Sequence, residues 1–157
     1  MDPMKRVIGL LMMGIVAVTL LTGAGKKDKF TITFHVQGEE HEGSFVQKDP
    51  SLGEGIYFRK VPIITHNDMK FFYPFLSADG ETYGAVFPLS TAGQQRLATL
   101  KVTEPGKLLR AVVSGVPVDT LRVDSDGPTE AIVIWRGLNE KVFKLFEKKL
   151  ERRRFGV

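Results

Sequence analysis

The feature that most constrains the fold is the stretch from residue 108 to residue 138, which reads LLRAVVSGVPVDTLRVDSDGPTEAIVIWRGL. It holds three short apolar runs, and two turn signals separate them, Ser114-Gly115 and Asp126-Gly127-Pro128. Short apolar runs bounded by glycine and proline are typical of strands, because most helices are longer than such runs. The stretch therefore predicts three antiparallel core strands, at 108–113, 116–123 and 131–135.

More strands are predicted before this stretch. Residues 30–37 alternate apolar and polar side chains, which indicates a half-buried strand. A short strand is expected at 44–46 and another at 56–61. Within 75–87, the pair Asp79-Gly80 lies between two apolar flanks, which is the pattern of a β-hairpin.

Three helix starts are visible. A hydroxyl stands three residues before a carboxylate or amide at Thr65 and at Thr91, the spacing of a capping box. The first predicts one helical turn over 68–71, and the second predicts a full helix. Asn139 caps a final helix. We expect that helix to bury its apolar residues and to expose its basic ones; the apolar set is Val142, Phe143, Phe146 and Leu150.

The predicted fold class is α+β. It consists of an antiparallel sheet with two helices packed on one face, preceded by a short N-terminal β segment. The expected division of the chain is an N-terminal β segment over 25–64 and an α+β domain over 65–157. We expect the side chains of Trp135, Phe143 and Phe146 in the core, because each stands at an apolar position of the strand or helix periodicity.

The first 24 residues predict a secretory signal peptide. Lys5 and Arg6 precede an apolar run over 7–21, and small residues follow at 22–24, so cleavage is expected after Ala24. The alternative is an uncleaved membrane anchor, but a spanning helix needs about 20 apolar residues. The expected location is therefore periplasmic or extracellular. The chain has no cysteine, so disulfides cannot support the exported form.

The charge is concentrated at the C-terminus. The whole chain has a formal net charge of +4, and the last nineteen residues alone contribute +4. The rest of the expected mature chain is close to neutral, so binding to nucleic acid is not expected. A possible surface for an anionic partner or lipid consists of Lys148, Lys149, Arg152, Arg153 and Arg154. The alternative is a solvated helix face.

A family resemblance covers residues 61–150. Its segments are ITHNDMKFFYPF, SADGETYGAVFPLS, STAGQQRLATL, GKLLRAVVSGVPVDTLRV and AIVIWRGL. Their order and turns resemble the head part of the first large periplasmic domain of SecD, the membrane subunit that assists bacterial protein export. The resemblance implies a free-standing domain with a SecD-head-like fold. This chain has one short apolar segment where SecD has a transmembrane bundle, so the translocase function does not transfer with the fold.

The sequence contains only weak candidates for a metal site or a catalytic site. His35 and His41 lie near Glu39, Glu40 and Glu42, and imidazole with carboxylates suits zinc, but the spacing matches no established ligand pattern. A solvated turn, with the strand histidine pointing outward, explains this cluster better. No serine stands in a nucleophile elbow, and no motif calls for a cofactor.

The sequence therefore predicts an exported, non-enzymatic binding or accessory module that contacts other polypeptides. The partner is expected to be another exported or membrane protein. Two alternatives stay open. One is an exported hydrolase or metal-dependent enzyme with an unrecognised site. The other is a membrane-tethered accessory of export machinery, which requires that residues 1–24 stay attached.

Overall fold

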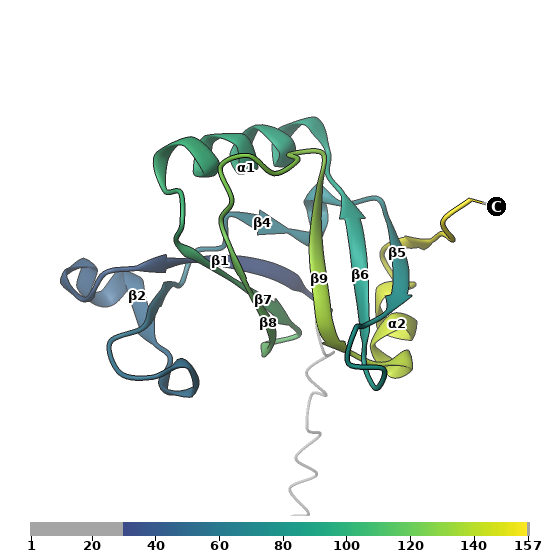
Figure 1. The fold of residues 1–157 in the computed structure, drawn as a ribbon, viewed down its shortest axis with the longest axis horizontal. Coiled ribbons are helices and arrows are strands. Elements are labelled where there is room, and N and C mark those ends of the chain that lie inside the picture. Colours follow the sequence, from purple (N-terminus) through teal and green to yellow (C-terminus); the bar gives the residue numbers. More distant parts are fainter. Residues whose placement is uncertain (1–29, 157) are drawn as a thin grey trace, which may run out of the picture.

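The α+β class is confirmed by a computed structural model, which describes residues 30–156 (Figure 1). The predicted signal peptide lies outside these residues. The strands are β1 (Ile32–Gly38), β2 (Val46–Lys48), β3 (Tyr57–Arg59), β4 (Ile64–Thr65), β5 (Phe71–Leu76), β6 (Tyr83–Pro88), β7 (Leu108–Val113), β8 (Val116–Arg122), β9 (Ala131–Leu138) and β10 (Glu151–Arg152). The helices are α1 (Thr91–Thr103) and α2 (Glu140–Phe146), with 3-10 turns η2 (Glu40–Phe45), η3 (Pro50–Leu52) and η4 (His66–Asp68).

The first sheet has six strands. Its order is β2-β3-β1-β7-β8, β4 also pairs with β1, and every pairing is antiparallel. The alternation in β1 puts Ile32, Phe34 and Val36 on the inner face, where all three are buried. Because β1 pairs with β7 from residue 32 to residue 36, residues from the N-terminal β segment and from the predicted stretch 108–138 share one sheet.

The second sheet has four strands in the order β10-β5-β6-β9. β5 and β6 form the predicted hairpin, and Asp79 stabilises its turn by accepting the backbone N–H groups of Glu81 and Thr82 at 2.9 and 2.8 Å. β9 pairs antiparallel with β6, whereas β10 pairs parallel with β5.

The core is one continuous cluster that includes residues from both sheets and both helices. It includes a group of four fully buried phenylalanines in mutual contact: Phe72, Phe87, Phe143 and Phe146. Their ring centroids are 5.3 to 6.3 Å apart in the described pairs, a spacing that favours stacked and edge-to-face contacts. The side chains of α2 thus cover the inner face of the four-stranded sheet.

Helix α1 is fastened to the turn η4. The capping box predicted at Thr91 is wrong by one residue: Ser90 caps α1 by accepting the N–H of Gly93 at 3.2 Å, and Thr91 is the first helical residue. Arg96 of α1 forms an ion pair with the buried Asp68 of η4. The capping box predicted at Thr65 is present, but the helical turn covers only residues 66–68. The next residues enter β5, where Phe72 is fully buried in the core.

The strands of 108–138 are divided between the two sheets. β7 and β8 pair with each other, but β9 pairs with β6. After β8 the chain runs along α1 before it descends as β9 (Figure 1), and the Nζ of Lys101 donates to the carbonyl of Pro128 at 2.8 Å. This detour carries β9 to the edge of the other sheet.

The predicted final helix is shorter than expected. α2 ends at Phe146, and the Leu150 N–H still donates to the Phe146 carbonyl at 2.8 Å before the chain straightens into β10. Leu150 is buried, so the turn after α2 delivers one more apolar side chain to the core. The prediction of a basic helix face at residues 148–154 is therefore wrong. None of the described helices is long and apolar enough to cross a membrane.

Candidate binding surfaces

The outer face of the four-stranded sheet is apolar. Strand alternation directs one set of side chains to the core and the other set outward. The outward set, which we call the aromatic face, consists of Phe71, Tyr73, Phe75, Val86, Val133 and Trp135. The register aligns them in rows, with Tyr73 opposite Val86 and Val86 opposite Val133.

Gly84 shapes the centre of the aromatic face. A Cβ at this position would lie 2.3 Å from Cζ of Phe75 and 2.5 Å from the carbonyl oxygen of Ile134. Because glycine leaves that space open, the Phe75 ring crosses β6 and meets Trp135 edge-on, with centroids 6.0 Å apart. The two rings form a continuous apolar surface over three strands.

The aromatic face remains accessible in the described part of the chain. Trp135 is 59% exposed, and the other five side chains are half-buried. A pocket of about 310 Å³ continues the surface at one end, between Phe71, Pro88 and the start of α1. Contiguous accessible apolar surface is a common feature of binding sites.

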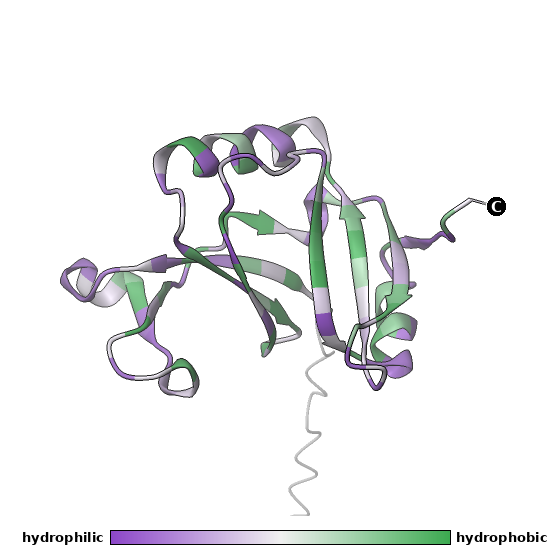
Figure 2. Ribbon diagram, viewed as in Figure 1, coloured by the Kyte–Doolittle hydropathy of each residue, from purple (hydrophilic) through white to green (hydrophobic). Residues whose placement is uncertain are grey.

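The C-terminal tail touches one border of the aromatic face. Arg153 places its guanidinium 3.9 Å from the centroid of the Phe71 ring, and Phe155 stacks on Tyr73 with centroids 4.7 Å apart. Figure 2 shows the tail as a mainly hydrophilic segment beside the hydrophobic strands. The tail therefore covers part of the apolar surface without being buried itself.

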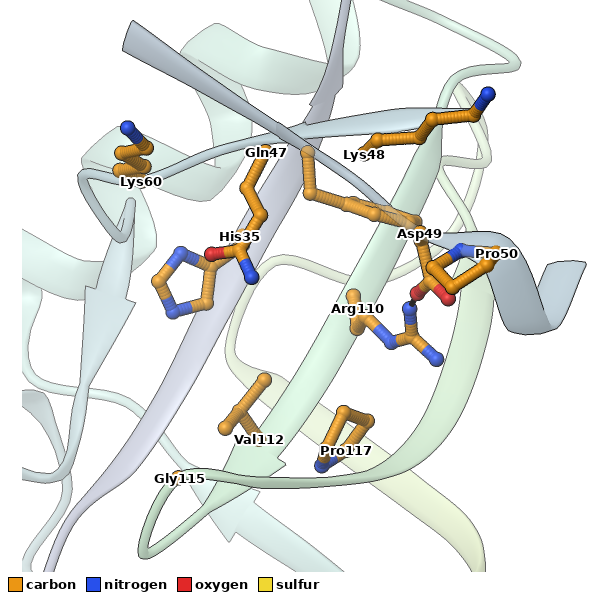
Figure 3. A pocket seen from close by; sticks show the side chains of 11 residues that line it. His35, Gln47, Lys48, Asp49, Pro50, Lys60, Arg110, Val112, Gly115 and Pro117 are labelled. Carbon is orange, nitrogen blue, oxygen red and sulfur yellow. Dashed lines mark ion pairs between the residues drawn. The ribbon is translucent and has the colours of Figure 1, made fainter. Parts of the chain in front are cut away.

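A second hollow lies on the outer face of the six-stranded sheet. It has a volume of about 440 Å³ and lies between β1, β7 and the arm formed by β2 and β3. Its lining includes His35, Gln47, Phe58, Arg110 and Val112 (Figure 3). We call it the arm groove.

An ion pair fastens the arm over this groove. Arg110 pairs with Asp49 and donates to the Ser51 hydroxyl at 3.1 Å, while its guanidinium lies 5.2 Å from the Phe58 ring. The side chains of Arg110 and Asp49 are 12% and 11% exposed, so water screens the pair only weakly. Lys48 and Lys60 line the rim and point their ammonium groups away from its centre (Figure 3).

His35 lies in the arm groove with both ring nitrogens occupied. Nδ1 is 2.8 Å from the carbonyl of Arg59, so it carries the proton, and Nε2 accepts from the Thr33 hydroxyl at 2.9 Å. His41 is an exposed residue of η2. Among residues 30–156, no three side chains of His, Cys, Asp or Glu are grouped to hold a metal ion. The two hydrogen bonds fix the orientation of the His35 ring at the floor of the arm groove.

The basic residues expected on one helix face are spread over a turn and an edge strand. Lys148 and Lys149 follow α2, whereas Arg152 belongs to β10. Arg153 donates to Glu151 at 3.0 and 3.1 Å, and Arg152 lies over the Phe143 ring. A surface for an anionic partner at these five residues stays a prediction.

The prediction that Trp135 belongs to the core is wrong, whereas Phe143 and Phe146 are confirmed as fully buried. The aromatic face was missed although a signal was present. In the β5 sequence FFYPFL every residue is apolar or aromatic, so both faces of the strand are apolar. A strand with only one buried face needs apolar residues at alternate positions only.

Residues 30–156 thus form an α+β domain with two mostly antiparallel sheets and two helices. No protein-family model matches the chain, and no curated protein matches it significantly. Solved structures of SecDF do match. One is a crystal structure of SecDF in a super-membrane-facing form, with 13% identity, 74% of this chain covered and a TM-score of 0.49.

A second is a structure of SecDF described as a membrane component that enhances protein export. It shares 11% identity over 78% of this chain, with a TM-score of 0.53. This chain spans 17% of the first SecDF chain and 63% of the second. At this identity the likeness shows the fold alone. The predicted resemblance is thus confirmed as a fold similarity to part of SecDF.

Proposed function

We propose that this chain is an exported, non-enzymatic binding or accessory module whose aromatic face binds apolar segments of other polypeptides. The observation that carries the proposal is the accessible row of aromatic side chains on a rigid sheet. Aromatic residues are over-represented among side chains that dominate binding energy. The backbone of the sheet holds the rings in place, so binding costs little conformational entropy.

Trp135 is the side chain expected to contribute most. Fully burying a large apolar side chain is worth about 1.5–3 kcal/mol. Trp135 is 59% exposed in the described structure, so a partner can bury more than half of it. Phe75 contacts the indole edge-to-face from one side. A polypeptide with apolar residues at alternate positions would match the rows of this face.

The fold similarity supports the proposal without carrying it. A structure that shares the fold belongs to SecDF, which is described as enhancing protein export. We propose that residues 65–157 correspond to a SecD-head-like domain with residues 25–64 as an added β segment. We further propose a periplasmic location, in which unfolded exported chains would be the natural partners.

The test uses the purified exported chain and a reduced, carboxymethylated protein that stays unfolded. We expect saturable binding by titration calorimetry, weakened at least tenfold by Trp135→Ala, which corresponds to a loss of about 1.4 kcal/mol. Val102→Ala is the matched control, since Val102 is 82% exposed on α1, away from the aromatic face. Equal affinity of the two variants, or no binding by the unaltered chain, would refute the proposal.

N-terminal sequencing of the protein recovered from cells tests export. Gly25 as the first residue supports a free exported module. An intact N-terminus together with recovery in the membrane fraction supports the tethered alternative instead.

A further inference from the structure

The edge of the four-stranded sheet at β5 is closed by the protein's own tail. β10 pairs parallel with β5 through Glu151 opposite Phe71 and Arg152 opposite Phe72. Two tail N–H groups donate to it, from Glu151 to the Lys70 carbonyl at 3.0 Å and from Arg153 to the Phe72 carbonyl at 2.8 Å. An exposed strand edge binds any chain that presents matching backbone groups.

The side chains of the tail show which chemistry this edge accepts. Alternate residues of a strand point to the same face, so Arg153 and Phe155 both reach the aromatic face. Arg153 lies over the Phe71 ring and Phe155 stacks on Tyr73. A cation over an aromatic ring and two stacked rings each add binding energy in a defined geometry.

We propose that the β5 edge, with Phe71 and Tyr73, is a docking site for an extended peptide that carries arginine or lysine two residues before an aromatic residue, aligned parallel to β5. The C-terminal tail occupies this site in the described structure and competes with such a peptide. This inference rests on the proposed function, because it names one class of segment that the aromatic face binds.

The tail is held weakly enough to be displaced. β10 has two residues, and every residue from 151 to 156 is exposed. The carbonyls of Lys70 and Phe72 accept from the tail, and by strand alternation the backbone of Pro74 faces the same edge. Pro74 limits the pairing because proline has no N–H to donate. Leu150 anchors the start of the tail in the core, so the tail returns to the site at high effective concentration.

The inference predicts that removing the tail opens the site. The probe is the synthetic peptide Glu-Arg-Arg-Arg-Phe-Gly, a copy of residues 151–156. We expect it to bind a chain ending at Leu150 at least tenfold more tightly than it binds the full chain. Replacing the second arginine of the peptide, which copies Arg153, or its phenylalanine by alanine should weaken binding to the shortened chain at least fivefold.

A second variant protects the test if the shortened chain does not fold. The full chain with Arg153→Ala and Phe155→Ala keeps the backbone of β10 and lacks both ring contacts. It should bind the peptide more tightly than the unaltered chain does. Tyr73→Ala in the shortened or doubly substituted chain should abolish the gain, whereas Val102→Ala should not.

The outcomes separate this inference from the proposed function. If folded tail variants bind the unfolded protein but gain no affinity for the peptide, the docking site is refuted and the aromatic face keeps its function. If they bind the peptide but not the unfolded protein, the docking site stands and the broader function fails. Absence of both activities refutes both.

Discussion

Gly84→Ala tests the geometry on which the aromatic face depends. The added Cβ would lie within 2.6 Å of two atoms of the Phe75 ring and 2.5 Å from the carbonyl oxygen of Ile134. The ring can rotate away, but the carbonyl belongs to the neighbouring strand β9 and cannot. The sheet must therefore shift locally, and the contact between Phe75 and Trp135 must open.

The loss of stability expected for Gly84→Ala is the difference between two opposing effects. Overpacking costs about 1–3 kcal/mol, and a backbone clash belongs in the upper half of that range. Alanine also restricts the unfolded chain, which returns about 0.4–1 kcal/mol. The free energy of unfolding should therefore fall by about 2 kcal/mol, and the melting temperature by about 8 °C for a domain of this size.

Urea denaturation followed by Trp135 fluorescence measures this change, because Trp135 is the only tryptophan in the chain. Gly156→Ala is the control, since a Cβ there meets no atom within 4 Å. Adding Phe75→Ala to Gly84→Ala separates the two clashes, because only the ring clash disappears. A Gly84→Ala variant with the stability of the control would refute the close approach of β5, β6 and β9.

Three further predictions concern stability. Asp49→Ala and Arg110→Ala should each lower the free energy of unfolding, measured by urea denaturation, by about 3 kcal/mol, because each change leaves a buried charge without its partner. The double variant should lose less than the sum of the two single losses, and additive losses would contradict this. Burial first, and then the charge of Lys149, lower the pKa of His66. Its unfolded state binds the proton more readily, so stability should be complete above about pH 6.5 and fall as the pH drops from there toward the folded-state pKa; a His66→Gln variant that shows the same fall in thermal melts would refute it. Leu150→Ala should cost about 2–5 kcal/mol and speed hydrogen exchange at residues 151–153, and unchanged exchange would show that Leu150 does not anchor the tail.

The local elements were predictable because their signals act over a few residues. The hairpin at Asp79-Gly80, the capping box at Thr65 and the alternation of β1 depend on backbone preferences and on one buried face. The end of α2 was not predictable in this way. The spacing of Leu150 from Phe146 fits a continued helix. Leu150 can also reach the core from a turn that follows α2, and only tertiary packing decides between the helix and the turn.

The sequence by itself determined the α+β class, the hairpin at Asp79-Gly80, the caps at Thr65 and Asn139, and the exclusion of disulfides. The tertiary structure decided which strand pairs with which, since the detour held by Lys101 sends β9 to β6. It also decided that Trp135 faces solvent and that the tail lies on β5. The alternation of side chains along a strand shows that the strand has two faces. Which face is buried depends on the elements that pack against the strand in the folded protein.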